Sequence, residues 1–195
     1  MKYRSWATEV RTMGKRIGLV ADNHSRSEDG ADVPDAVLRA FDGVDLVMHL
    51  GDAGTWGTLD RLATVAPVIA VLGGHNGISP DLRVAGLTRV EKIEGLRVGM
   101  VHDLVGRGAA AEMRDAVVFK GRPRDALRTL LGGEIDLLAY AGTHDPRIAW
   151  AEGLLLVNPG SPTLPAGRAK GSLGHVALVE IAEGIASARV VDLSV

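Results

Sequence analysis

Aspartate and histidine recur in this sequence directly after short apolar segments. Five such groups are present: Asp22-Asn23-His24, Gly51-Asp52, Gly73-Gly74-His75-Asn76, His102-Asp103 and Gly142-Thr143-His144. Carboxylate oxygens and imidazole nitrogens are the ligands that hydrolytic metal sites need, because they suit Mn, Fe and Zn. A set distributed over five segments therefore predicts a metal site for hydrolysis more strongly than any single Asp–His pair.

The apolar segments before these groups are short and apolar on both faces, which is typical of strands buried within a sheet. They cover residues 16–21, 44–50, 68–72, 96–101 and 135–141. Apolar residues at helical spacing predict helices over 33–41, 55–65 and 123–131. Because strands and helices alternate, we predict an α/β fold, in which the carboxyl ends of the strands meet at one crevice.

The C-terminal third has a different pattern. Four segments, 148–151, 154–157, 175–181 and 188–193, read as strands without helices between them. Turn signals separate them, among them Glu152-Gly153 and Glu183-Gly184. We predict a second, largely antiparallel sheet here. Residues 107–121 have no clean pattern, and a helical lid and a mobile loop both remain open.

Composition limits the classes of function. The chain has 195 residues, and we interpret residues 1–14 as an N-terminal extension and 15–195 as a single domain. A net charge of -2 gives no basic footprint, so no specific nucleic-acid partner is expected. The absence of cysteine excludes thiolate ligands and fits a cytoplasmic protein. No apolar run is long enough for a bilayer, so no membrane partner is expected.

In their order along the chain, the motifs resemble those of the calcineurin-like metallophosphoesterases, in particular the short bacterial and archaeal phosphodiesterase branch. The resemblance runs from Lys15 to the end and includes an intact Asn158-Pro159-Gly160-Ser161. It implies a four-layer α/β/β/α sandwich, in which two mixed β-sheets lie face to face with helices outside. It also implies hydrolysis of a small phosphodiester or phosphomonoester by metal-activated water.

The resemblance assigns ligands residue by residue. One metal would be held by four residues that all match the family: Asp22, His24, Asp52 and His144. The other would share Asp52 and take His102, but Gly74 and Gly142 stand where the family has Asn and His. The resemblance therefore implies one or two divalent ions (Mn, Fe, Zn or Ni). Asn76 and Asp103 are candidate substitute ligands or site-lining residues.

Each assignment has a structural alternative. Asp22 and Asp52 could be turn or cap residues, and His49 is best interpreted as a buried structural histidine. We assign catalytic roles to Asp52 and to His75, as proton donor to the leaving group, with a simple loop residue as the other interpretation of His75.

The functions left open are of different classes. The two glycines favour, as the alternative to an enzyme, a catalytically degenerate binding or scaffold protein. A nucleotide-binding sensor with a mononuclear site is a third option. Homo-oligomerisation is compatible with a small member of this family.

Overall fold

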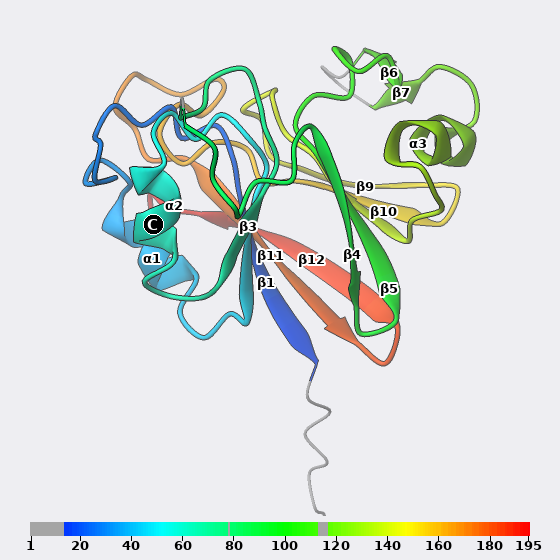
Figure 1. Ribbon diagram of the computed structural model, residues 1–195, viewed down its shortest axis with the longest axis horizontal. Coiled ribbons are helices and arrows are strands. Elements are labelled where there is room, and N and C mark those ends of the chain that lie inside the picture. The colour runs from blue at the N-terminus through cyan, green and yellow to red at the C-terminus, as the bar shows by residue number, and fades with distance from the viewer. Residues whose placement is uncertain (1–13, 78, 113–116) are drawn as a thin grey trace, which may run out of the picture.

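Two five-stranded sheets lie face to face in the computed structural model, which describes residues 14–77, 79–112 and 117–195 (Figure 1). The first sheet has the order β12 (Ile185–Asp192), β11 (His175–Ala182), β1 (Lys15–Val20), β2 (Leu46–His49) and β3 (Val68–Ala70). The second has the order β4 (Thr88–Ile93), β5 (Leu96–Val101), β8 (Leu137–Ala139), β10 (Leu154–Asn158) and β9 (Arg147–Ala151). In the first sheet β1, β2 and β3 are parallel, and in the second β5, β8 and β10 are parallel. The other pairings are antiparallel, so both sheets are mixed.

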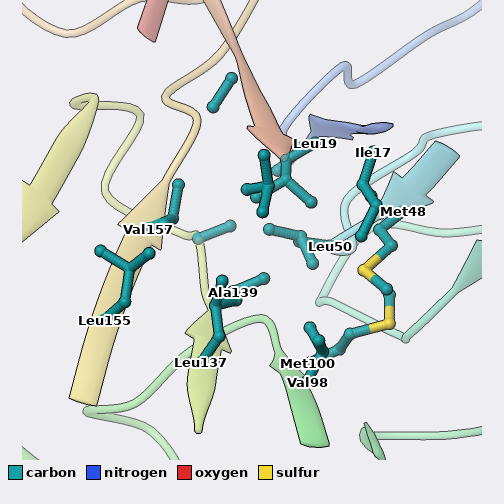
Figure 2. Packing of buried hydrophobic residues seen from close by; sticks show 14 of the residues in the cluster. Ile17, Leu19, Met48, Leu50, Val98, Met100, Leu137, Ala139, Leu155 and Val157 are labelled. Atoms are coloured by element: carbon teal, nitrogen blue, oxygen red, sulfur yellow. The ribbon is translucent and has the colours of Figure 1, made fainter. Parts of the chain in front are cut away.

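Alternation along the strands explains why their sequences are apolar throughout. In β1, Ile17 and Leu19 face the second sheet, whereas Val20 contacts the helices outside, because successive side chains point to opposite faces. The inter-sheet core also contains Met48 and Met100, one from each sheet (Figure 2). Full burial of one such side chain contributes about 1.5–3 kcal/mol.

Helices cover the outer faces of both sheets. Helices α1 (Asp35–Ala40) and α2 (Gly57–Leu62) pack on the first sheet, and α3 (Pro123–Leu131) packs on the second. This arrangement confirms the predicted four-layer α/β/β/α sandwich. Within the described residues the longest helix, α3, has nine residues, and none is long and apolar enough to cross a membrane.

The prediction of a separate C-terminal sheet is wrong. Strands β9 and β10 belong to the second sheet, whereas β11 and β12 extend the first, with β11 antiparallel to β1. The sequence pattern identifies strands but not their partners, because any free sheet edge can accept an apolar strand. Strand β4 was not predicted, because charged residues such as Arg89 and Glu91 interrupt its apolar pattern.

The segment 107–121 forms a short two-stranded sheet where the structure describes it. Strand β6 (Ala110–Glu112) is antiparallel to β7 (Val118–Phe119). No helix occurs in the described part of this segment, so the helical lid is not found there. Residues 113–116, and residues 1–13 of the proposed extension, lie outside the described residues.

Candidate metal centre

Loops that follow five strands, from both sheets, converge on one cluster of carboxylates and imidazoles. The cluster takes one residue after each of β2, β3, β5 and β8 and two after β1: Asp22, His24, Asp52, His75, His102 and His144. Three overlapping triplets among them have ligand atoms within 4.8 Å of one another. The two sheets therefore bring together residues that are up to 122 positions apart in the sequence (His144 against Asp22).

The four ligands assigned to the first metal all have left-handed backbone conformations. Their φ angles are 55° at Asp22, 46° at His24, 56° at Asp52 and 59° at His144. A positive φ is uncommon for residues other than glycine, and such strain concentrates at functional sites. Outside this cluster, positive φ in described non-glycine residues occurs only at Glu94, Glu152 and Glu183, each just before a turn glycine.

Asp52 lies at the centre of the cluster. Its Oδ2 is 3.5 Å from Nε2 of His24, 3.5 Å from Nε2 of His102 and 3.2 Å from Nδ1 of His75. Its Oδ1 accepts a 2.7 Å hydrogen bond from the main-chain N–H of His75. One carboxylate thus faces three imidazoles, which is the position expected of a bridging ligand.

Asp22 presents a buried oxygen that no hydrogen bond satisfies. Oδ2 accepts a 3.1 Å hydrogen bond from the N–H of Gly142, but Oδ1 has no donor. That Oδ1 is 3.6 Å from Nε2 of His144 and 3.8 Å from Nε2 of His102. A buried charge without a partner is costly, and a cation among these donors would remove the cost. The residues present therefore fit a divalent metal.

Two of the imidazoles are held in the tautomer that a metal requires. Nδ1 of His102 lies 2.8 Å from the carbonyl oxygen of Leu50, and Nδ1 of His144 lies 2.8 Å from that of Leu164. Because a carbonyl only accepts, each Nδ1 carries a proton, and in the neutral ring each Nε2 keeps a free lone pair. Both Nε2 atoms face the carboxylates, so the outer carbonyls orient the ligands as they do in metal sites generally.

Charges in the cluster shift the pKa values of its members. Burial raises the pKa of Asp22 above its usual value, although His102 and His144 counteract this effect. Burial also opposes ionisation of Asp52, but hydrogen bonds from His102 and from the His75 N–H prevail, so its pKa is lowered. For His102, burial is outweighed by the facing carboxylates of Asp52 and Asp22, which favour the protonated ring, and its pKa is raised. Burial lowers the pKa of His24.

The two glycines at the second metal position leave space rather than ligands. A Cβ at Gly74 would lie 3.8 Å from Oδ1 of Asp52, an ordinary contact. A Cβ at Gly142 would lie 3.4 Å from Nε2 of His102, but the φ of +86° there disfavours any side chain. Asp52 and His102 are thus the two donors that remain on this side of the cluster.

The proposed substitute ligands, Asn76 and Asp103, are hydrogen-bonded to nearby main-chain groups. The side chain of Asn76 makes two hydrogen bonds with the main chain of Gly73. Its Oδ1 accepts from the Gly73 N–H at 3.3 Å, and its Nδ2 donates to the Gly73 carbonyl at 2.9 Å. Asp103 accepts a 2.8 Å hydrogen bond from the N–H of Val105. Among the described residues, Asp103 belongs to none of the groups of three or more carboxylates and imidazoles that could hold a metal. Both side chains shape turns here.

The Asn158–Ser161 motif supports the first loop of the cluster. Ser161 Oγ donates a 2.8 Å hydrogen bond to the carbonyl of Asp22 and accepts one of 2.8 Å from the N–H of Leu164. Ser161 thereby connects the Asp22 loop to the segment whose carbonyl orients His144. Sequence reasoning did not find Leu50 and Leu164, because their role lies in main-chain carbonyls and has no side-chain signal.

His49 has the structural position predicted for it. It is fully buried; its Nδ1 accepts a 3.2 Å hydrogen bond from the Gly51 N–H, and its Nε2 lies 3.0 Å from Oδ1 of Asn23. An imidazole with an acceptor at Nδ1 carries its proton on Nε2. Neutral His49 therefore links the loops that carry Asp22 and Asp52.

A pocket of about 650 Å³ opens beside the cluster. His24 and His75 line it, together with residues of the loop after β1 and of the segment between β10 and β11. The side chain of His75 is 73% exposed. Its Nδ1 points to Asp52 Oδ2, so His75 lies between the buried carboxylate and the open pocket.

The family model and a curated relative that this chain matches are both of phosphoesterases. Residues 16–184 match the family model described as the calcineurin-like phosphoesterase superfamily domain. A probable metallophosphoesterase of Methanothermobacter thermautotrophicus is 34% identical over 155 residues, which are 76% of this chain and 78% of the relative.

Solved structures with the same fold are more distant in sequence. Vacuolar protein sorting 29 from Cryptosporidium parvum gives a TM-score of 0.66 at 18% identity, over 92% of this chain and 97% of that one. A novel archaeal phosphodiesterase gives a TM-score of 0.59 at 16% identity, over 90% of this chain and 99% of that one.

Proposed function

The chain belongs to the calcineurin-like phosphoesterase superfamily, and from that premise we propose that it hydrolyses phosphate esters at a divalent-metal centre. The observation that carries the proposal is the buried Oδ1 of Asp22, which lacks a hydrogen-bond donor and faces the free Nε2 of His144 and of His102. An orphaned carboxylate oxygen opposite two imidazole nitrogens, each with a free lone pair when its ring is neutral, is an arrangement that a cation stabilises.

The proposed ligands are divided unequally between two metal positions, and the second position, which has fewer ligands, is called the depleted side. Asp22, His24, Asp52 and His144 would hold the first ion, and Asp52 and His102 would face the second position. Because Gly74 and Gly142 supply no side-chain donor, we propose a centre that binds one ion firmly. A divalent ion here would withdraw charge from the phosphoryl oxygens and lower the pKa of a coordinated water. Mn, Fe, Zn and Ni all accept these N and O ligands.

The reaction is the hydrolysis of a phosphodiester or a phosphomonoester. A water oxygen forms a bond to phosphorus, the bond from phosphorus to the leaving oxygen breaks, and that oxygen takes up a proton. His75 is the group placed to deliver this proton. Its Nδ1–H donates to Asp52 Oδ2 at 3.2 Å, which orients the ring and leaves Nε2 for the proton that is transferred. A phosphodiester is the substrate suggested by the archaeal phosphodiesterase of the same fold.

Replacement of Asp22 by Asn tests the metal centre. Asn keeps an oxygen for the N–H of Gly142 but removes the buried charge. Without metal, the Asp22→Asn variant should unfold at a temperature no lower than wild type, because an unpaired buried carboxylate is lost. Added Mn²⁺ should raise the unfolding temperature of wild type and leave that of the variant nearly unchanged.

Hydrolysis of bis(p-nitrophenyl) phosphate is the matching activity measurement. Wild type with Mn²⁺ should release nitrophenol, and Asp52→Ala should release it at least about a hundredfold more slowly, since the shared ligand is gone. Equal rates for the two proteins would contradict the proposed enzyme.

The alternative is a binding or scaffold protein on the same fold. Two observations favour it: the glycines at positions 74 and 142, and the exposed Trp150 on the edge strand β9, with Ile148 beside it on the same face. This alternative would be supported if the purified protein contained no metal, gained no thermal stability from Mn²⁺ or Zn²⁺ and hydrolysed no phosphate ester.

A further inference from the structure

Two cationic side chains line the pocket beside the cluster, and the metal centre gives them no role. Arg26 belongs to the loop after β1, and Lys170 belongs to the segment between β10 and β11. Both are exposed. Within the described residues, neither charged group makes a hydrogen bond or an ion pair. Two unpaired cations, brought from distant parts of the sequence, therefore border the same pocket as His24 and His75.

The acidic residue of this pocket forms no ion pair with either cation. Asp32 also lines the pocket, but both its oxygens are engaged: the Ser25 hydroxyl donates to Oδ1, and the main-chain N–H of Arg26 donates to Oδ2 at 2.9 Å. Asp32 is thus fixed to its own loop by hydrogen bonds. One carboxylate against two cations leaves an excess of positive charge among the Asp, Arg and Lys side chains that line the pocket.

The pocket is too large for the reacting phosphoryl group alone. Its volume of about 650 Å³ lies within the range of sites that hold a whole small molecule. His24 and His75, which belong to the cluster, line the pocket together with the two cations. The volume that the reacting phosphoryl group does not fill is available to the organic part of the ester.

We propose that Arg26 and Lys170 bind a second phosphate on the organic part of the substrate, one that is not hydrolysed. The inference rests on the proposed function and adds a substrate class to it: phosphate esters of small organic molecules that carry a further phosphate group. Arg presents paired N–H donors to a phosphate, and Lys a compact positive charge. In this assignment Arg26 and Lys170 contact the second phosphate and not the reacting phosphoryl group, so both determine specificity.

A matched pair of substrates tests the proposal. Thymidine 5′-(p-nitrophenyl phosphate) and its 3′-phosphorylated derivative have the same reacting group and differ only in the second phosphate. Wild type with saturating Mn²⁺ should have a higher kcat/KM for the 3′-phosphorylated compound. Arg26→Gln and Lys170→Gln should each reduce that preference by roughly threefold to fivefold, as expected for one exposed charge, and the double variant by about tenfold or more.

Control variants separate a local effect from a general loss of charge. Arg39→Gln removes one exposed cation from α1, and Lys92→Gln removes one from β4. Neither residue lines this pocket. They should leave the preference unchanged. Bis(p-nitrophenyl) phosphate, which has no second phosphate, should be hydrolysed equally by wild type, Arg26→Gln and Lys170→Gln.

The outcomes are distinct. No preference in wild type, or equal losses on both thymidine substrates in the pocket variants, would overturn the second-phosphate site while the hydrolase remains. Absence of hydrolysis of all three compounds, bis(p-nitrophenyl) phosphate included, would instead remove the proposed function and this inference with it.

Discussion

The residue that most distinguishes this centre is Gly74. Its missing side chain leaves space next to Oδ1 of Asp52, and a Cβ would meet that oxygen only at 3.8 Å. The backbone at Gly74 has no left-handed strain, in contrast to Gly142 with a φ of +86°. Of the two lost donors, the one at position 74 is therefore the one that a substitution can restore.

Gly74→Asn should increase the number of metal ions that the protein binds. The new amide oxygen would join Asp52 and His102, giving the depleted side three donors. Measured by elemental analysis after dialysis against Mn²⁺, wild type should hold about one ion per chain and the variant should approach about two. Gly74→Ala, which fills the space without a donor, is the matched control. Equal metal content in all three proteins would contradict a mononuclear centre caused by the lost ligands.

At the scale of elements, the cluster depends on loops held by main-chain contacts. Ser161 connects the carbonyl of Asp22 to the N–H of Leu164, and the Leu164 carbonyl receives the Nδ1 proton of His144. A single hydroxyl at the end of β10 therefore supports two ligands that arise from β1 and β8. This explains why an intact Asn158–Ser161 motif accompanies a metal centre whose other side has lost ligands.

Ser161→Ala should weaken both the fold and the metal site. It removes the hydrogen bonds of Ser161 Oγ to the Asp22 carbonyl and from the Leu164 N–H and leaves that carbonyl only the 3.4 Å bond from Thr163 Oγ1, which costs about 0.5–1.5 kcal/mol of unfolding free energy. Mn²⁺ affinity, measured by calorimetry, should fall by roughly threefold to tenfold because His144 loses its fixed orientation. Ser187→Ala, on the exposed face of β12, is the control and should change neither quantity. An effect on stability with unchanged Mn²⁺ affinity would argue against the supporting role.

The sequence predicts much of the fold because each strand end carries its own signal. Residues such as Asp22 and His102 follow apolar strands, and the order of the motifs predicts the family, which the comparisons confirm. Strand partners could not be predicted, since β11 and β12 have the same apolar pattern as β9 and β10 but join the other sheet. The carbonyl of Leu164 could not be predicted either, because any residue supplies that group.

At the scale of the whole molecule, a buried histidine couples the fold to pH. His49 is fully buried at the end of β2, and burial lowers its pKa from 6.5 to about 3. In the folded protein it is neutral and bonded to Gly51 and Asn23. In the unfolded chain it takes up a proton near its ordinary pKa of about 6.5. Between these two values the unfolded state binds one more proton at this position than the folded state.

The contribution of His49 to stability should therefore be complete above about pH 6.5 and should diminish as the pH falls toward 3, with a slope of up to about 1.4 kcal/mol per pH unit. Urea unfolding in EDTA across this range should show the loss in wild type. His49→Gln, similar in size but without a titrating group, should be less stable near neutral pH and should lose stability less steeply on acidification. Other titrating groups, among them His24 and Asp22, are present in both proteins, so the difference between the two curves isolates His49. Parallel curves for the two proteins would mean that His49 is protonated in the fold as readily as in the unfolded chain, which its hydrogen bonds and complete burial oppose.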